Sequence, residues 1–183
     1  SMGGVIAILY SLRHQDLLRG LILSSPSIMP TAEAPRAKTA LAGFLSKYAP
    51  GFLVSNELDA NHISHDPGIV ASYLADPLNH DRISTRWYTE YLKSAAECLD
   101  RAGELTVPLL VFHGTDDRIV DFAGTVQVHE SATSRDKKKQ LFEGLYHETR
   151  NEVEHERVKV LDAAAKWILS HLGKEKKTGT AKK

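Results

Sequence analysis

The sequence lacks several features that would place a protein in a class at once. It has one cysteine, Cys98, which excludes an internal disulfide and favours a reducing compartment, so a cytoplasmic location is expected. No apolar run approaches the roughly 18 residues that a membrane-spanning helix needs. Neither sign of charge dominates, because 23 Lys and Arg balance 23 Asp and Glu. The net charge therefore gives no case for binding nucleic acid or an anionic membrane.

What is present is 183 residues of ordinary globular composition, enough for one domain. The informative stretch is the first one, Ser1-Met2-Gly3-Gly4, which runs into an apolar segment. It reads as the second half of a G-x-S-x-G nucleophile elbow, in which a serine stands on a tight strand-to-helix turn. The glycines after the serine are expected on steric grounds, because a side chain there would collide with the neighbouring strand.

Because the first glycine of that motif and the strand before it are absent, we expect the chain to be the C-terminal part of a longer protein, beginning at its nucleophile. Two other interpretations of Ser1 stay open at this point. A Ser-Met pair at the start of a chain is also what an expression tag leaves behind after cleavage. A terminal serine is also the nucleophile of hydrolases that use their own α-amine as the base.

The order of apolar and polar residues predicts an α/β fold with a parallel sheet. Residues 21–26 and 106–113 are short apolar runs bounded by turn residues, typical of strands buried on both faces. Residues 139–142 are predicted to make a third strand. Helices are predicted around these strands, at residues 2–14, 33–48, 67–75, 84–102, 122–133 and 153–172. The last helix is expected to bury one face, formed by Val153, Val160, Leu161, Ala164, Ile168 and Leu172.

An insertion separates the first two predicted strands, and within it helix signals replace strand signals. Asp66 and Ser84 are well placed to cap two of its helices. We expect this insertion to form a helical lid over the strand ends. The chain then divides into a core at residues 1–29 and 104–172, the lid at residues 30–103, and a disordered basic tail at residues 173–183.

Three reactive side chains fall at equivalent places in this pattern. Ser1 precedes a helix, Asp117 follows one buried strand and His147 follows the next. Ligands bind at the carboxyl ends of strands in open parallel sheets, so residues placed there can converge. The order Ser, Asp, His along the chain is the one that α/β-hydrolases use, and it differs from the orders of other serine hydrolases.

Three motifs carry a resemblance to a known family. Ser1-Met2-Gly3-Gly4 is similar to the end of a G-H-S-M-G-G elbow. Residues 108–120 resemble an acid motif, in which a strand precedes H-G-x-x-D-x-I-V. Residues 143–148 resemble a histidine motif, and Asn151-Glu152 follows as it often does there. The family is the α/β-hydrolase superfamily, in its monoacylglycerol lipase and lysophospholipase group, often labelled serine aminopeptidase-like, and the resemblance covers about residues 1–172.

The resemblance implies a catalytic triad of Ser1, His147 and Asp117. His147 would take the proton of the Ser1 hydroxyl and return it to the leaving alcohol, while Asp117 would hold the imidazole. Water would then hydrolyse the acyl-enzyme on Ser1. The backbone N–H of Met2 is the expected oxyanion donor. The second donor would come from a loop that precedes this sequence.

Each assignment has an alternative. Asp116 could be the acid instead of Asp117, although the G-x-x-D spacing favours Asp117, and His147 could be structural. His113 is expected to bond to the backbone and pack. Four further side chains suggest a metal site but fit no standard zinc spacing, so no metal is expected; they are His62, His65, Asp66 and His80. Trp87, Tyr88 and Tyr91 are expected to form the core of the lid, and Cys98 to be a small buried hydrophobe.

The function that follows is hydrolysis of carboxylic esters of lipid-like small molecules, monoacylglycerols or lysophospholipids, without a cofactor. The alternatives are a peptidase, thioesterase or acyltransferase on the same triad, and a binding protein on the same fold. We expect transient contact of the lid with a membrane surface and no nucleic-acid partner. Residues 1–183 by themselves are expected to be poorly soluble and inactive.

Overall fold

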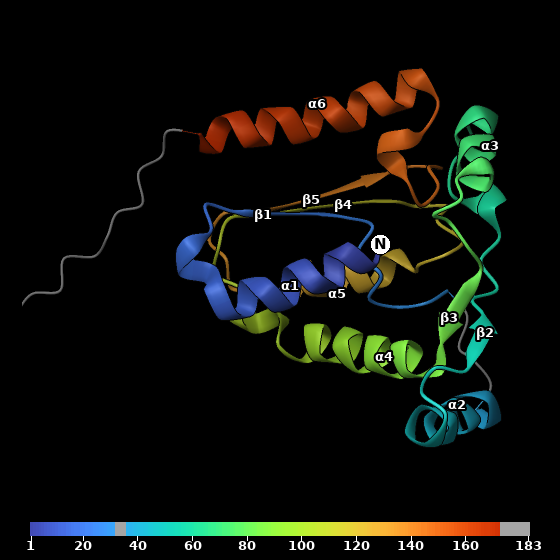
Figure 1. The fold of residues 1–183 in the computed structure, drawn as a ribbon. Helices are drawn as coiled ribbons and strands as arrows, with labels where there is room; N and C mark the ends of the chain where they lie inside the picture. Colours follow the sequence, from blue (N-terminus) through green and yellow to red (C-terminus); the bar gives the residue numbers. More distant parts are fainter. Residues whose placement is uncertain (32–35, 173–183) are drawn as a thin grey trace, which may run out of the picture.

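The computed structural model describes residues 1–31 and 36–172, and its centre is a three-stranded parallel sheet (Figure 1). The strands are β1 (Leu21–Ser24), β4 (Leu109–Gly114) and β5 (Lys137–Phe142), in the order β1-β4-β5. Leu109 pairs with Leu21 on one side and with Lys137 on the other. The predicted α/β class and all three predicted strands are confirmed.

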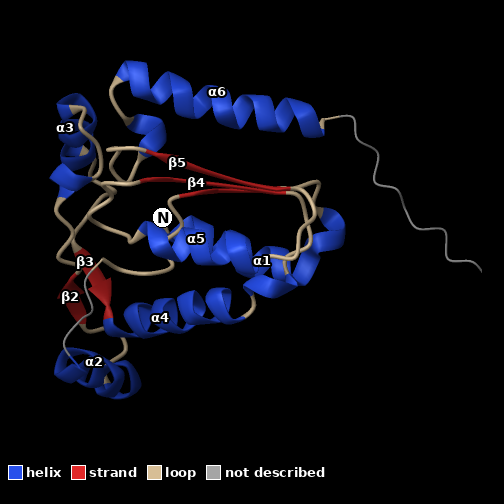
Figure 2. Ribbon diagram, turned by 180° about the vertical axis from the view of Figure 1, so that it is seen from behind, coloured by secondary structure: helices blue, strands red, loops and turns tan. Residues whose placement is uncertain are grey.

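Helices cover both faces of the sheet, which is why β1 and the central strand β4 are rich in apolar residues (Figure 2). The edge strand β5 differs, because it begins with three lysines and only Phe142 in it is buried. Helix α6 (Glu154–His171) lies on one face. Helices α1 (Met2–His14) and α5 (Phe122–Ser131) lie on the other, and α4 (Thr85–Asp100) packs against them from outside. The parallel strands all point towards the end of the sheet where α1 begins.

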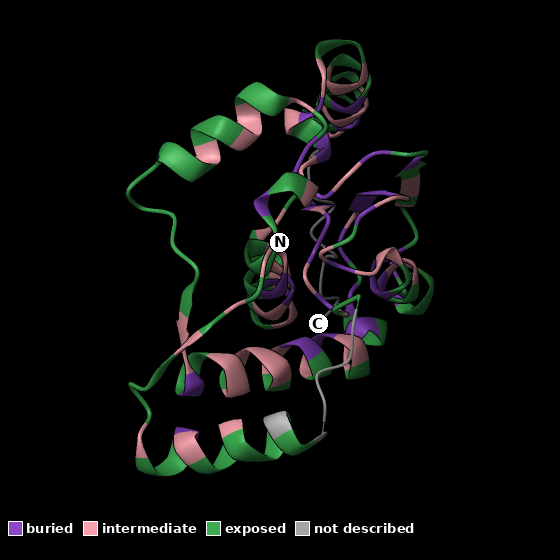
Figure 3. Ribbon diagram, turned by 90° about the vertical axis from the view of Figure 1, so that its right-hand side faces the viewer, coloured by how far each residue is buried: buried purple, intermediate pink, exposed green. Residues whose placement is uncertain are grey.

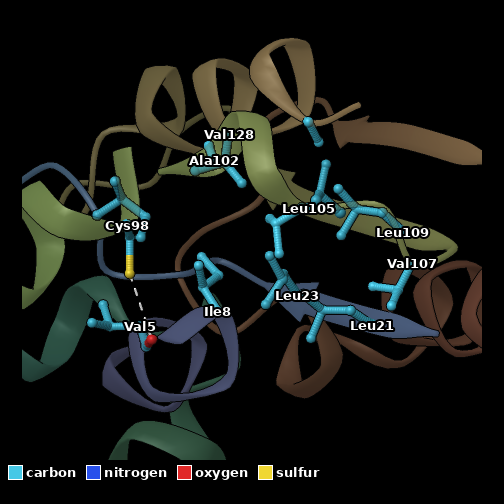
Figure 4. Packing of buried hydrophobic residues seen from close by; sticks show 13 residues of the cluster. Val5, Ile8, Leu21, Leu23, Cys98, Ala102, Leu105, Val107, Leu109 and Val128 are labelled. Atoms are coloured by element: carbon cyan, nitrogen blue, oxygen red, sulfur yellow. Dashed lines mark hydrogen bonds between the residues drawn. The ribbon is translucent and has the colours of Figure 1, made fainter. Parts of the chain in front are cut away.

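Strand β4 lies in the middle of the sheet, and all six of its residues are buried. Its side chains alternate between two cores, as the period of a strand requires. Leu109 and Val111 join the core formed with α1, α4 and α5, while Leu110 and Phe112 join the core under α6. The first core includes Cys98, whose thiol donates a hydrogen bond to the carbonyl of Val5 (Figure 4).

Cys98 is fully buried, and burial, followed by the charge of Glu97, raises its pKa to about 12. The thiol is therefore protonated at neutral pH. The expectation that Cys98 acts as a small buried hydrophobe is confirmed.

The insertion contains α2 (Arg36–Tyr48), β2 (Leu53–Ser55), α3 (Pro67–Ala75), β3 (Arg82–Ser84) and α4. Both predicted caps are present, because Asp66 accepts from the N–H of Gly68 and Ser84 from that of Trp87. The antiparallel pair β2–β3 was not predicted. Strands of three residues are too short to show the alternation by which strands are recognised.

The insertion lies beside the carboxyl end of the sheet, and the outward surface of α2 is largely exposed (Figure 3). The C-terminal half of α4 is part of the main core, through Cys98 and the partly buried Leu99. The described helices are all too short or too polar to cross a lipid bilayer.

The predicted buried face of α6 is wrong in part. Val160 is buried as expected and Ala164 is partly buried, but Leu161 is 49% and Ile168 43% exposed. The buried stripe instead runs through Trp167, seven residues after Val160, because the indole fits over Gly20. A Cβ at Gly20 would lie 2.6 Å from the Trp167 ring. The predicted basic tail lies outside the described residues.

Candidate active site

Asp117 and His147 come from neighbouring strands and meet in a hydrogen bond. Asp117 lies in the turn after β4, His147 lies in the loop after β5, and Oδ2 of Asp117 is 2.7 Å from Nδ1 of His147. Both side chains are buried, with 0% of Asp117 and 6% of His147 exposed. Because an ionised carboxylate only accepts, Nδ1 of His147 carries the proton. Nε2 is then the basic nitrogen of a neutral ring.

The Asp117 carboxylate is surrounded by donors. Its Oδ1 accepts from the backbone N–H groups of Ile119 and Val120, at 2.8 and 3.0 Å. Burial raises the pKa of Asp117, but hydrogen bonds from His113 and His147, with the N–H of Val120, outweigh it and hold this pKa well below its usual range. The carboxylate is therefore ionised at neutral pH.

Asp116, the alternative acid, points elsewhere. Its carboxylate is 3.3 Å from the guanidinium of Arg118, and its side chain is 47% exposed. The structure thus brings Asp117, and not Asp116, against His147.

Gly114, the last residue of β4, lets the two site loops approach each other. A Cβ at this position would collide with the carbonyl of Leu145 and would lie 2.6 Å from the carbonyl oxygen of Tyr146. The N–H of Asp116 also donates to the Leu145 carbonyl, at 3.1 Å. Glycine at this position therefore allows the turn that holds Asp117 to touch the loop that holds His147.

Ser1 is at the N-cap position of α1, at the same end of the sheet, and its side chain makes no capping hydrogen bond. It lines a cavity of about 300 Å³ with Gly4, Ser24, His147, Glu148 and Arg150. No hydrogen bond joins the Ser1 hydroxyl to His147 in the described part of the chain; the two residues share the cavity wall. The α-amine donates to the carbonyl of Ser24 at 3.2 Å, and burial, followed by the charge of Arg150, lowers its pKa to about 6.

The two glycines after Ser1 differ in their surroundings. A Cβ at Gly4 would lie 2.5 Å from Cβ and 2.8 Å from Cα of Pro26, two residues after the end of β1, so the close approach of α1 to this segment requires glycine. A Cβ at Gly3 would meet no described atom within 4 Å. The structure therefore gives a steric reason for Gly4 only. Met2 is the first residue of α1, where backbone N–H groups have no partner within the helix.

The loop that carries His147 is held by Glu152, whose side chain is completely buried. Its carboxylate accepts from the N–H of Tyr146 at 2.8 Å, from the N–H of His65 at 3.0 Å and from Nδ1 of His65 at 3.0 Å. The His65 ring also stacks on Tyr146, with 3.6 Å between ring centres. Glu152 thus joins the histidine loop to the insertion.

Sequence reasoning assigned no role to Glu152. The only available signal was its place after the histidine motif, because a carboxylate with a partner 87 residues away leaves no local pattern.

The four side chains that suggested a metal site have separate local roles. His65 binds Glu152, Asp66 caps α3, His80 accepts from the N–H of Arg82, and the ring of His62 meets the edge of Tyr146. The structure does not bring these four side chains together into one site.

His113 is not bonded to the backbone as expected, and that prediction is wrong. Its two ring nitrogens bond to the side chains of Asp117 and Thr125. His113, Asp117 and His147 have donor atoms close enough to hold a cation. These atoms are already used in hydrogen bonds to one another, so we assign no metal to them.

The aromatic side chains of α4 connect the insertion to the sheet. Trp87 stacks on Tyr91 with 5.3 Å between ring centres, and it is 39% exposed. The Tyr91 hydroxyl lies 2.6 Å from Oγ of Ser27, after β1. Tyr91 therefore contacts the segment after β1 as well as its neighbours in the insertion.

The chain is similar to a known protein family and to several individual proteins. The family described as serine aminopeptidase, S33 matches residues 1–154. Over 94% of its length the chain is 37% identical to a Mycolicibacterium smegmatis protein named monoacylglycerol lipase, of which it covers 61%. It is 29% identical to the human monoglyceride lipase, covering 92% of this chain and 56% of that protein.

Solved structures have the same fold. The chain matches the crystal structure of a Paleococcus ferrophilus monoacylglycerol lipase with a TM-score of 0.87 and 32% identity, over 93% of this chain and 66% of that one. It matches a soluble variant of the Saccharomyces cerevisiae monoglyceride lipase with a TM-score of 0.81 and 24% identity, over 93% of this chain and 63% of that one. The chain thus spans less than two thirds of these relatives.

Glu152 gives a test of how the histidine loop is held. In the full-length protein, Glu152→Gln places an amide NH₂ where a carboxylate oxygen accepts hydrogen bonds, so one buried N–H loses its acceptor. The free energy of unfolding, measured by urea denaturation, should fall by about 1–3 kcal/mol. The matched control is Glu154→Gln, because Glu154 is exposed two residues later, and it should change stability by less than about 0.5 kcal/mol. Equal losses in both variants would contradict the assignment.

Proposed function

The chain belongs to the serine aminopeptidase S33 family of α/β-hydrolases, and we propose that the protein that carries it is a serine hydrolase of lipid-like carboxylic esters. The observation that carries the proposal is the hydrogen bond between Asp117 and His147 at one wall of the cavity that Ser1 also lines. Because the chain spans 61% of the Mycolicibacterium relative, the activity is proposed for the full-length protein.

In this proposal Ser1 is the nucleophile and Nε2 of His147 is the general base. The Ser1 hydroxyl attacks the ester carbonyl while His147 takes its proton, and the imidazolium then gives the proton to the leaving alcohol. Asp117 fixes the tautomer that leaves Nε2 free and offsets the positive charge during attack. Water, activated by the same nitrogen, releases the carboxylic acid and restores Ser1.

The oxyanion of the tetrahedral intermediate would be held by the backbone N–H of Met2, which is at the N-terminus of α1. Its position in the first turn supports this role, because such N–H groups point away from the helix towards a ligand. One donor of this kind contributes about 10²–10³ in rate.

Residues 30–103 are proposed as the lid, with residues 1–29 and 104–172 as the hydrolase core. The names of the relatives, monoacylglycerol and monoglyceride lipases, support a glycerol ester with one acyl chain as the substrate class. The lid helix α2 exposes apolar side chains, Leu41, Phe44 and Tyr48 among them, which supports contact with a lipid surface.

The second candidate is cleavage of an aminoacyl amide on the same triad, and the family description, serine aminopeptidase, favours it. The two reactions share the attack on a carbonyl and differ in the leaving group. Comparing turnover of monoacylglycerols and aminoacyl amides by the full-length protein separates them.

A fluorophosphonate probe tests the nucleophile. We expect it to label Ser1 in the full-length protein, and Ser1→Ala to lose both the label and the turnover of monoacylglycerol. A terminal nucleophile needs the free α-amine of Ser1, so it would not be labelled when other residues are joined ahead of Ser1. Labelling that survives Ser1→Ala would contradict the proposal.

The two adjacent acids provide a matched pair. Asp117→Asn offers His147 a donor in place of an acceptor and favours the wrong tautomer, so kcat/KM for an ester should fall by roughly 10³–10⁴-fold. Asp116→Asn alters an exposed ion pair and should change kcat/KM by less than about twofold. A larger loss in the Asp116 variant would reassign the acid.

A further inference from the structure

A second histidine shares the Asp117 oxygen that holds His147. Nε2 of His113, near the end of β4, is 2.8 Å from Oδ2 of Asp117, and Nδ1 of His147 is 2.7 Å from the same atom. No part of the His113 or Asp117 side chain is exposed. Since the carboxylate oxygen only accepts, both nitrogens are donors, and both carry a proton.

The other nitrogen of His113 is bonded to Thr125 in α5. Nδ1 of His113 is 2.6 Å from Oγ1 of Thr125, and Thr125 is completely buried. With Nε2 protonated, a neutral imidazole accepts at Nδ1, and the threonine hydroxyl is the donor. This arrangement satisfies both nitrogens of the buried ring, and it aligns three groups from α5, β4 and the following turn.

We propose that His113, oriented by Thr125, is a positioning residue that fixes the Asp117 carboxylate against His147 and takes up part of its negative charge. The inference rests on the proposed roles of Asp117 and His147. Two donors on one oxygen divide its charge, so each bond is weaker than it would be alone. Donation from Thr125 polarises the ring and strengthens the bond that His113 makes.

As a consequence, His147 is less basic than it would be if Oδ2 of Asp117 accepted a hydrogen bond from His147 alone. If the His113 bond is weakened, more negative charge remains on Oδ2 and stabilises the imidazolium form of His147. The pH at which His147 loses its proton then rises, and the acidic limb of kcat/KM moves to higher pH, because His147 must be neutral to act as a base.

Other ionisable groups surround this site. They are Asp116 and Arg118 after β4, Asp121 before α5, Glu148, Arg150 and Glu152 after His147, and His65 from the insertion. None of them is bonded to Thr125. A substitution of Thr125 between uncharged residues changes none of these charges.

The test compares variants of Thr125 in the full-length protein. Thr125→Val keeps the shape and removes the hydroxyl, Thr125→Ala removes it at smaller volume, and Thr125→Ser retains it. The titration of the His147 ring is followed by NMR, with the signal assigned from its loss in His147→Gln. The acidic limb of kcat/KM is recorded with a monoacylglycerol, and folding is checked by circular dichroism.

We expect the midpoint of His147 to rise by about half a pH unit in the valine and alanine variants, and to stay unchanged in the serine variant. Unchanged midpoints in the hydroxyl-free variants would overturn the inference, even if both variants are less stable. An equal shift in all three variants would overturn it as well, because the hydroxyl would not be the cause. The NMR titration needs no turnover, so absence of esterase activity in the unsubstituted protein would defeat the proposed function and leave this test intact.

Discussion

The carboxylate of Asp117 is buried at the end of the central strand, and four hydrogen bonds keep it ionised there. An isolated buried carboxylate would take up a proton, because desolvation disfavours its charged form. The donors come from the turn that holds Asp117, from β4 and from the loop after β5. The same hydrogen bonds that keep the charge also fix the tautomer of His147, so ionisation of the acid and orientation of the base have one physical cause.

Close backbone contact makes this arrangement possible. Glycine at position 114 lets the turn after β4 touch the loop after β5, and glycine at position 4 lets α1 pass over the segment after β1. Glu152 then ties the histidine loop to the insertion, through a carboxylate that has His65 and the backbone as its donors. The parallel sheet supplies the common edge, and these contacts determine which side chains meet there.

Much of this could be predicted from the sequence, because the signals are local. The apolar runs of β1 and β4 and the caps Asp66 and Ser84 depend on residues close in the chain. Ser1, Asp117 and His147 are far apart in the chain, but each stands in a short local motif, and the resemblance to a known family joined the three. The pair β2–β3 and the buried face of α6 could not be predicted. The first is too short to show a period, and the second depends on how Trp167 fits over Gly20. The partners of His113 and Glu152 are set by tertiary packing, which no local pattern records.

The central claim is that Ser1, His147 and Asp117 form one catalytic unit. The most direct measurement is a crystal structure of the full-length protein after reaction with a phosphonate ester. The account predicts a covalent bond from Oγ of Ser1 to phosphorus, with Nε2 of His147 about 2.6–3.2 Å from an oxygen of the adduct and Nδ1 still bonded to Asp117. A phosphonate on another residue, or a His147 ring turned away from Asp117 in the adduct, would contradict it.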